Sequence, residues 1–231
     1  MSKPPSSIPS GAPALWQQLG ATAQALQAVR AGHSSSTSLA AVPASLRPGV
    51  QALLFQVLRQ LGRAQALRQQ LAPRTPPPGL DALLCTALAL AWDEASAPYA
   101  PFTLVNQAVE AAKRGPVARQ AGFVNACLRR FLREREALLA TVEADPVASS
   151  NHPAWWLQRL RQDWPTQWQA IVAANQQHAP MALRVNLQKT TLAQYQQALA
   201  AMDLEAHPVG DCGLLLRQPQ PVQRLPGWSE G

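Results

Sequence analysis

The helical spacing of the apolar residues constrains this chain more than any other feature of its sequence. From Leu15 onward, leucine, valine and alanine return at positions i, i+3, i+4 and i+7, as expected where one face of each helix is buried. The pattern is densest from Leu80 to Trp92, so this segment is expected at the centre of the core. No alternating pattern typical of strands occurs before about residue 150. We therefore expect a mainly α protein whose first domain, residues 14–147, is all-α with about seven helices.

Proline and glycine indicate where these helices begin and end. Pro48 is placed to open a helix that Gly62 divides from its continuation, and the prolines of residues 72–79 predict a surface loop. A basic last turn followed by Gly115 predicts a helix end, and Pro116 predicts the next start. The expected helices cover residues 14–31, 48–61, 62–71, 80–92, 103–114 and a segment from Pro116, with residues 33–46 as a loop or short turn.

The remainder of the chain has a different pattern. Residues 152–177 are expected to form two helices, the second opened by Pro165. A strand, a helix and two strands should then make a small α+β unit whose helix packs on one face of the sheet. Their expected ranges are 182–187, 192–202, 204–209 and 213–217. The expected domains are a disordered leader over 1–13, the helical domain over 14–147, and a helical connector with the α+β domain over 148–231, which ends in a loop that looks cut rather than finished.

The charge of the chain favours a polyanionic partner. Twenty Lys and Arg residues against 13 Asp and Glu give a net charge of +7 and an isoelectric point near 10.2. Nearly all of the basic residues are arginine, which binds phosphate through a planar fork of donors. The excess positive charge falls mainly in residues 1–150, so the helical domain is the part expected to attract RNA or DNA.

One segment, from Pro116 to Arg135, concentrates this charge. If it is one continuous helix, its apolar residues cluster on one face and four arginines lie on the other. No acid interrupts them before Glu134, whereas solvated faces usually mix both signs. The face can still be read as a nucleic-acid surface, as a solvated face, or as a surface that docks on another domain. Its arginines are Arg119, Arg129, Arg130 and Arg133, and a second basic set is Arg59, Arg63 and Arg68.

No self-contained catalytic or metal site is expected. The chain has no Gly-rich phosphate loop, nucleophile elbow or HExxH motif. Its three cysteines, Cys85, Cys127 and Cys212, form no CxxC pair, so neither a metal site nor a disulfide framework is indicated. No signal peptide and no membrane-length apolar stretch occur, so a cytoplasmic location without membrane partners is expected.

Several motifs together resemble a known family. Phe123-Val-Asn-Ala-Cys-Leu-Arg129, followed by Leu183-Arg-Val-Asn186 and Lys189-Thr-Thr191, is similar to the N-terminal region of the RsmB (Sun) family of bacterial ribosomal RNA cytosine-5 methyltransferases. Leu225-Pro-Gly-Trp-Ser-Glu-Gly231 resembles the join to that family's catalytic domain. The resemblance implies a NusB-like helical domain and a small second domain, with the catalytic domain absent. It also implies that S-adenosylmethionine serves the full-length protein and that this piece holds neither cofactor nor catalytic residue.

The resemblance and the charge pattern together give a candidate RNA-binding set. Ribosomal RNA and the protein's own C-terminal catalytic domain are the partners implied. For Asn125 a bond to a neighbouring helix end is the favoured alternative to RNA contact, whereas Asn186 and Lys189 can equally contact RNA or cap the start of a helix. The set is Arg59, Arg63, Lys113, Arg114, Arg119, Asn125, Arg129, Arg130, Arg133, Asn186 and Lys189.

Three functions from different classes remain open at this point. The first is the RNA-recognition part of an S-adenosylmethionine-dependent 16S ribosomal RNA cytosine-C5 methyltransferase. The second is a free-standing NusB-like transcription antitermination module, which the residues after about 150 disfavour because such a module ends with its helical domain. The third is a structural helical adaptor with no affinity for RNA.

Overall fold

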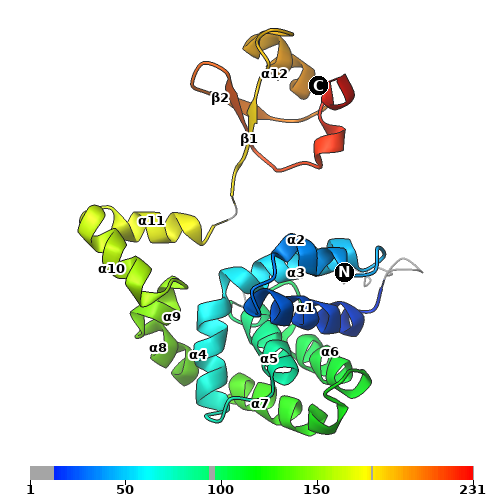
Figure 1. Ribbon diagram of the computed structural model, residues 1–231, viewed down its shortest axis with the longest axis vertical. Helices are drawn as coiled ribbons and strands as arrows, with labels where there is room; N and C mark the ends of the chain where they lie inside the picture. Colours follow the sequence, from blue (N-terminus) through cyan, green and yellow to red (C-terminus); the bar gives the residue numbers. More distant parts are fainter. Residues whose placement is uncertain (1–12, 94–96, 178, 231) are drawn as a thin grey trace, which may run out of the picture. The chain divides into compact units, whose positions relative to one another are not determined.

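The computed structural model describes residues 13–93, 97–177 and 179–230. The expected leader, residues 1–13, lies almost wholly outside the described residues. The chain divides into two compact units, one ending at Gln176 and the other beginning at Gln177 (Figure 1). The first is all-helical and the second is a small α+β unit, so the expected fold class is confirmed.

The helical unit is built around α5 (Pro78–Leu90), which is buried from Leu80 to its last residue (Figure 1). A helix that is apolar on every side needs cover on every side, and α5 packs against α1, α3, α4, α6 and α7. The sequence correctly predicted this central position. The other helices of the unit are α1 (Leu15–Arg30), α2 (Ser35–Ala40), α3 (Arg47–Arg59), α4 (Leu61–Leu71), α6 (Pro101–Arg114), α7 (Ala121–Arg133), α8 (Arg135–Glu143), α9 (Pro146–Ser150), α10 (Ala154–Asp163) and α11 (Trp168–Asn175).

The described residues before Asn151 thus form nine α-helices instead of about seven. The additional ones are short. In the region expected as a loop, the hydroxyl of Ser34 accepts a hydrogen bond from the backbone N–H of Thr37 and begins α2. The side chain of Asp145 begins α9 in the same way, by accepting from the N–H of Val147.

Two expected helix boundaries were wrong, the start of α5 and the break between α3 and α4. Pro78 belongs to α5 and not to the preceding loop, since proline at the first helical position lacks only an N–H that would have no partner. The break between α3 and α4 falls at Gln60 and not at Gly62. Gly62 instead lies in the first turn of α4, where its N–H donates to Asn151 Oδ1 at 2.5 Å, and a Cβ there would come within 3.2 Å of the Asn151 Cα.

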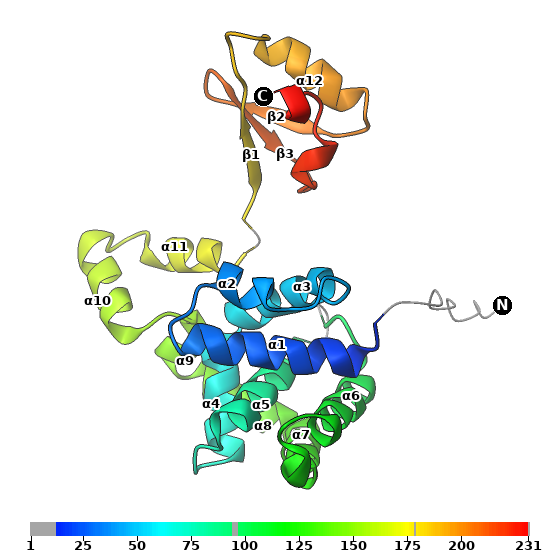
Figure 2. The ribbon, with the colours of Figure 1, turned by 45° about the vertical axis from the view of Figure 1, so that its right-hand side comes forward.

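The α+β unit contains a three-stranded antiparallel sheet in the order β1-β3-β2 (Figure 2). Its strands β1 (Met181–Arg184), β2 (Ala206–Val209) and β3 (Gly213–Leu216) are somewhat shorter than expected but lie in the expected order. Helix α12 (Leu192–Ala200) begins with a capping box between Thr191 and Gln194 and buries Leu199 against Leu214 of the sheet. The final residues, expected as a plain loop, form the 3-10 turns η2 (Val222–Arg224) and η3 (Trp228–Glu230).

Candidate nucleic-acid interface

The basic residues of the helical unit fall into two classes according to what they contact. Arg63, a candidate from the sequence, has a side chain that is only 19% exposed. Its guanidinium stacks on the Trp92 ring at 5.0 Å, donates to Gln60 Oε1 at 2.9 Å and lies 3.5 Å from Glu143 Oε1. Arg59 is half-buried at the last residue of α3. These side chains contact their own domain.

Other arginines hold the helical unit together. Arg68, of the second basic set, pairs through Nε with Asp81 Oδ1 at 2.8 Å, and Arg30 pairs with the other oxygen of the same buried carboxylate at 2.5 Å. Arg135 donates to the carbonyl oxygens of Ala91 at 2.7 Å and Trp92 at 2.6 Å. Arg135 therefore satisfies backbone acceptors at the C-terminal end of α5, which have no partner within the helix.

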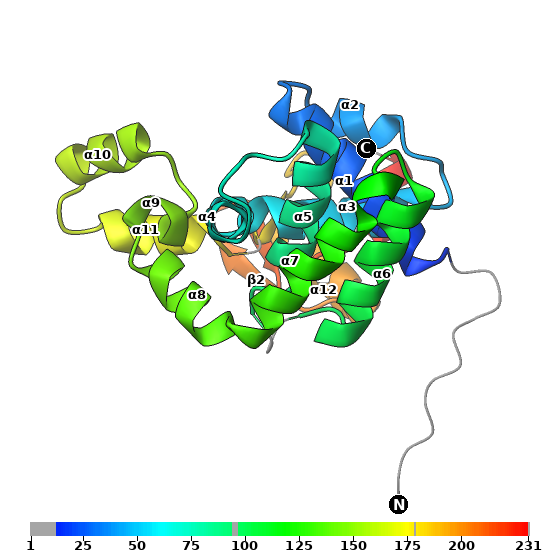
Figure 3. The same ribbon diagram turned by 90° about the horizontal axis from the view of Figure 1, so that it is seen from below.

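A further group of basic residues lies on α6, on α7 and in the turn between them, and these two helices pack side by side (Figure 3). Lys113 and Arg114 are exposed in the last turn of α6, where positive charge also complements the helix dipole. Arg114 pairs with Glu110 and stacks on the Trp16 ring at 4.8 Å. Arg119 is exposed in the short 3-10 turn η1 (Ala118–Gln120) between the two helices.

That 3-10 turn corrects the expected geometry of the arginine face. The segment from Pro116 to Arg135 is not one continuous helix, so a constant rotation of 100° per residue cannot carry Arg119 onto the face of α7. Within α7 the expected division between a buried and a basic side is confirmed for Arg129 and Arg133, which are exposed and four residues apart. The buried residues opposite them are Ala121, Val124, Cys127, Leu128 and Phe131.

Arg130 contacts both an acidic side chain and a backbone carbonyl of its own domain. Its Nε donates to Glu134 Oε2 at 2.9 Å and its Nη1 lies 3.4 Å from the carbonyl oxygen of Gln70. Glu134 is paired with Arg130, as Glu110 is with Arg114. Within the ranges the structure describes, Arg119, Arg129 and Arg133 have no acidic partner. We refer to the exposed residues Lys113, Arg114, Arg119, Arg129 and Arg133 as the α6–α7 basic surface.

Of the three remaining candidates, Asn125 lies in the helical unit and Asn186 and Lys189 lie in the α+β unit. Asn125 is half-buried on α7, and its side chain has no hydrogen-bond partner in the described part of the chain, so the alternative of a bond to a helix end is not observed. In the α+β unit, Asn186 Oδ1 accepts from the backbone N–H of Gln188 at 3.1 Å, which closes a tight turn. The carbonyl of Asn186 also accepts from the N–H of Lys189 at 3.0 Å. The turn leaves the Lys189 side chain exposed.

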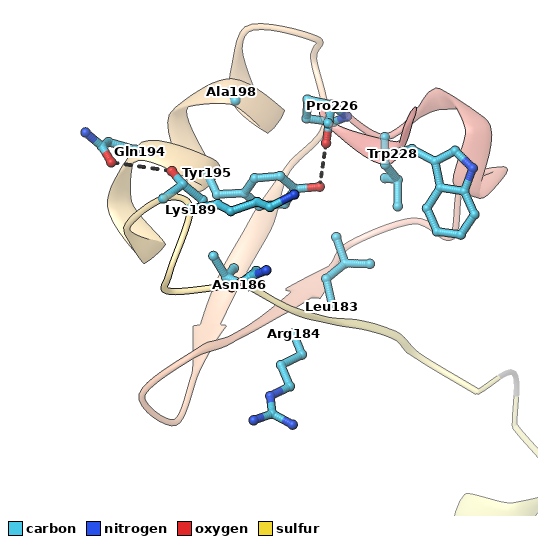
Figure 4. A pocket seen from close by; sticks show the side chains of 13 residues that line it. Leu183, Arg184, Asn186, Lys189, Gln194, Tyr195, Ala198, Pro226 and Trp228 are labelled. Atoms are coloured by element: carbon cyan, nitrogen blue, oxygen red, sulfur yellow. Dashed lines mark hydrogen bonds between the residues drawn. The ribbon is translucent and has the colours of Figure 1, made fainter. Parts of the chain in front are cut away.

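The α+β unit contains a cavity of about 590 Å³ that was not predicted from the sequence, and Lys189 is one of the residues that line it. The cavity lies between β1, α12 and the C-terminal 3-10 turns (Figure 4). Lys189 and Tyr195 line one side, and Trp228 faces them from the other. The Tyr195 hydroxyl donates to the carbonyl oxygen of Pro226 at 2.9 Å, and burial raises the pKa of Tyr195, so the phenol keeps this proton near neutral pH. The only sequence signal was Trp228 itself, an aromatic residue in a Pro-Gly loop.

The two cysteines of the helical unit are buried and are not reactive thiols. Burial, with Asp81 nearby, raises the pKa of the Cys85 thiol to about 12, and burial also raises the pKa of Cys127, so neither forms a thiolate near neutral pH. No group of three or more His, Cys, Asp or Glu residues with metal-binding geometry occurs within the described ranges. No helix there has both the length and the apolar character needed to cross a bilayer.

Two segments of the chain match known families. Residues 18–133 match the NusB family, and residues 152–223 match the Methyltr_RsmF/B-like, ferredoxin-like domain. The crystal structure of PH0851 is similar in fold, with a TM-score of 0.61 over 97% of this chain and 52% of that chain. Its sequence identity of 15% supports the fold alone.

The chain is also similar to proteins named ribosomal RNA small subunit methyltransferase B. It is 37% identical over 221 residues to that of Vibrio cholerae, covering 91% of this chain and 50% of the relative. It is 34% identical over 221 residues to that of Pseudomonas syringae, covering 91% and 49%, and 33% identical over 211 residues to that of Pasteurella multocida, covering 89% and 47%. The chain therefore spans about half the length of these curated relatives.

Proposed function

This chain belongs to the NusB family, and on that premise we propose that it is the RNA-recognition, N-terminal part of a methyltransferase for 16S ribosomal RNA. The target is C5 of a cytosine and the methyl donor is S-adenosylmethionine. The observation that carries the proposal is the combination of a NusB segment with an RsmF/B-type ferredoxin-like segment, in that order. A free-standing antitermination module would not contain the second segment. With ribosomal RNA as the substrate, the site of action is the cytoplasm.

The α6–α7 basic surface is the part of the helical unit that supports phosphate binding best. Its five members are exposed, and three of them have no acidic partner among the described residues. Each side chain can neutralise a phosphate and release a counterion, which is the main source of sequence-independent affinity for RNA. Arg63 and Arg130 pack and pair within the domain and Arg59 is half-buried, so these three are not members of the surface, whereas Asn186 and Lys189 provide a second contact in the α+β unit.

The residues of this chain do not fit the methyl donor. An S-adenosylmethionine site in a Rossmann-like domain needs a Gly-rich turn between a parallel strand and a helix, and the described sheet is antiparallel throughout. Cys85 and Cys127 are buried with raised pKa values, so they are not available to attack a cytosine. We therefore place methyl transfer on a C-terminal catalytic domain outside this chain.

The salt dependence of RNA binding tests the proposed surface. Small-subunit ribosomal RNA made by transcription is titrated at several salt concentrations with the wild-type chain and with the double variant Arg129→Gln/Arg133→Gln. Each lost phosphate contact should reduce the slope of log affinity against log salt by about 0.7 to 0.9, so the double variant should lose about 1.4 to 1.8. The matched control is Arg159→Gln, an exposed arginine of α10 whose side chain is 72% accessible and which should leave the slope unchanged.

A methylation assay tests the division of labour. Incubated with labelled S-adenosylmethionine and small-subunit ribosomal RNA, the chain alone should transfer no label. Transfer by the chain alone would contradict the assignment of catalysis to another domain. An unchanged salt slope in a folded Arg129→Gln/Arg133→Gln variant would show that this face is solvated or docks on protein. A chain without any affinity for RNA would favour the structural adaptor.

A further inference from the structure

The cavity of the α+β unit is of the size that holds small molecules. Its volume of about 590 Å³ lies within the range of roughly 300–1,000 Å³ that is typical of ligand pockets. Apolar side chains, including Leu183, Ala198 and the buried Leu225, provide much of its wall. The proposed function names two of its lining residues, Asn186 and Lys189, as RNA contacts but gives the cavity itself no role.

The walls are fixed by hydrogen bonds. The Tyr195 hydroxyl holds Pro226, which carries the C-terminal turn, at 2.9 Å across the end of the cavity. On the opposite wall, the capping box between Thr191 and Gln194 fixes the first turn of α12, with the Gln194 N–H donating to Thr191 Oγ1 at 3.2 Å. These hydrogen bonds hold the walls in place, so binding does not have to order them.

The lining side chains favour a nucleotide. Trp228 is 55% exposed, and its ring is available for stacking. Lys189 extends over Tyr195 toward the hollow, whereas Arg184 points away from it (Figure 4). Asn186 adds both donors and acceptors, and no described residue of the lining is acidic. An aromatic surface beside a cation is the usual arrangement for holding an unpaired base and its phosphate.

We propose that this cavity holds one unpaired base of the bound RNA, stacked on Trp228 with its phosphate toward Lys189. The inference rests on the proposed function, because it takes RNA as the ligand, and it adds a preference for unpaired RNA. The α6–α7 basic surface contacts phosphates and gains little from unpaired bases. The cavity requires a base that is free of its stack, so a duplex cannot fill it.

Two fluorescein-labelled probes test the proposal by anisotropy, a short single-stranded RNA of mixed sequence and a blunt duplex that contains the same strand. Since stacking of one base is worth about 1–3 kcal/mol, Trp228→Ala should weaken single-strand binding about 5- to 150-fold and leave duplex binding unchanged. Trp228→Phe keeps a ring and should recover most of the affinity. The matched control is Trp164→Ala, which removes a tryptophan of nearly equal exposure, 53%, from the helical unit and should change neither affinity.

The outcomes separate this proposal from the one on which it rests. If the wild-type chain binds RNA with a steep salt dependence but Trp228→Ala, folded by its melting curve, binds both probes as the wild type does, the cavity is not a base site and the proposed function stands. Equal losses in Trp228→Ala and Trp164→Ala overturn it as well. If the wild-type chain binds neither probe, both proposals fail.

Discussion

Replacing Asp81 with alanine should destabilise the helical unit more than replacing its more exposed partner Arg30. The Asp81 side chain is 2% exposed in the first turn of α5 and carries two ion pairs, one to Arg30 of α1 at 2.5 Å and one to Arg68 of α4 at 2.8 Å. One carboxylate thus joins three helices. Sequence patterns gave no sign of it, because the surrounding residues are almost all apolar.

The magnitude follows from what each substitution leaves behind. Asp81→Ala leaves Arg68, whose side chain is only 11% exposed, as a buried charge without its partner, and such a loss costs about 3–5 kcal/mol. Arg30→Met leaves the buried Arg68–Asp81 pair intact, and since the Arg30 side chain is 32% exposed, its loss should cost about 1 kcal/mol. At about 2–4 °C per kcal/mol, Asp81→Ala should lower Tm by about 6–20 °C and Arg30→Met by at most about 4 °C.

Thermal unfolding followed by circular dichroism at 222 nm measures these shifts, because most of the helix lies in this unit. A triple variant with methionine at positions 30 and 68 and leucine at position 81 separates charge from packing. It should regain most of the lost stability, since apolar residues can replace a buried ion cluster at little cost. A smaller loss in Asp81→Ala than in Arg30→Met would refute the reasoning. If the triple variant were as unstable as Asp81→Ala, packing and not unpaired charge would be the cause.

Three further results are expected. Leu128→Ala, on the buried side of α7, should cost about 2–5 kcal/mol by denaturant unfolding and weaken RNA binding only where the chain unfolds. A thiol reagent at pH 8 should modify half-buried Cys212 in the native chain and reach Cys85 only after unfolding, because burial raises the pKa of Cys85 to about 12. Rapid modification of Cys85 in the native chain would contradict this. The hydrogen bond and charge of Arg217 lower the pKa of Glu205 in the folded chain. The pair therefore stabilises the fold at pH values above the pKa of Glu205 in the unfolded chain, and this stabilisation is lost as the pH falls through its pKa in the folded chain. In an NMR titration, Arg217→Gln should return the Glu205 carboxyl to its usual pKa.

The sequence predicted those parts of the fold that depend on local periodicity. The burial of α5 and the order of strands and helix in the α+β unit follow from apolar spacing, and both are observed. The errors occur where a turn depends on one hydrogen bond, as at Ser34, or where the helix changes type, as at η1. A 3-10 turn rotates each residue by about 120° instead of 100°, so a face extrapolated through it is wrong.

The roles of the arginines could not be predicted in the same way, because a role depends on what the rest of the fold brings near. Arg63 and Arg119 are indistinguishable as members of basic clusters in the sequence. Trp92, which follows α5, comes to lie under the Arg63 guanidinium at 5.0 Å, whereas no described acid pairs with Arg119.

What each arginine contacts determines where the positive charge of the helical unit can act on a partner. Arg30 and Arg68 share the charge of Asp81, while the guanidinium of Arg135 is used on backbone carbonyls of the α5 end. Glu110 and Glu134, which lie on or next to α6 and α7, are each held by an arginine four residues away. Arg119, Arg129 and Arg133 have no acidic partner among the described residues and so keep their charge for a partner. Positive charge that gathers on one edge can orient a polyanion as well as attract it, which a net charge spread evenly over the surface cannot do.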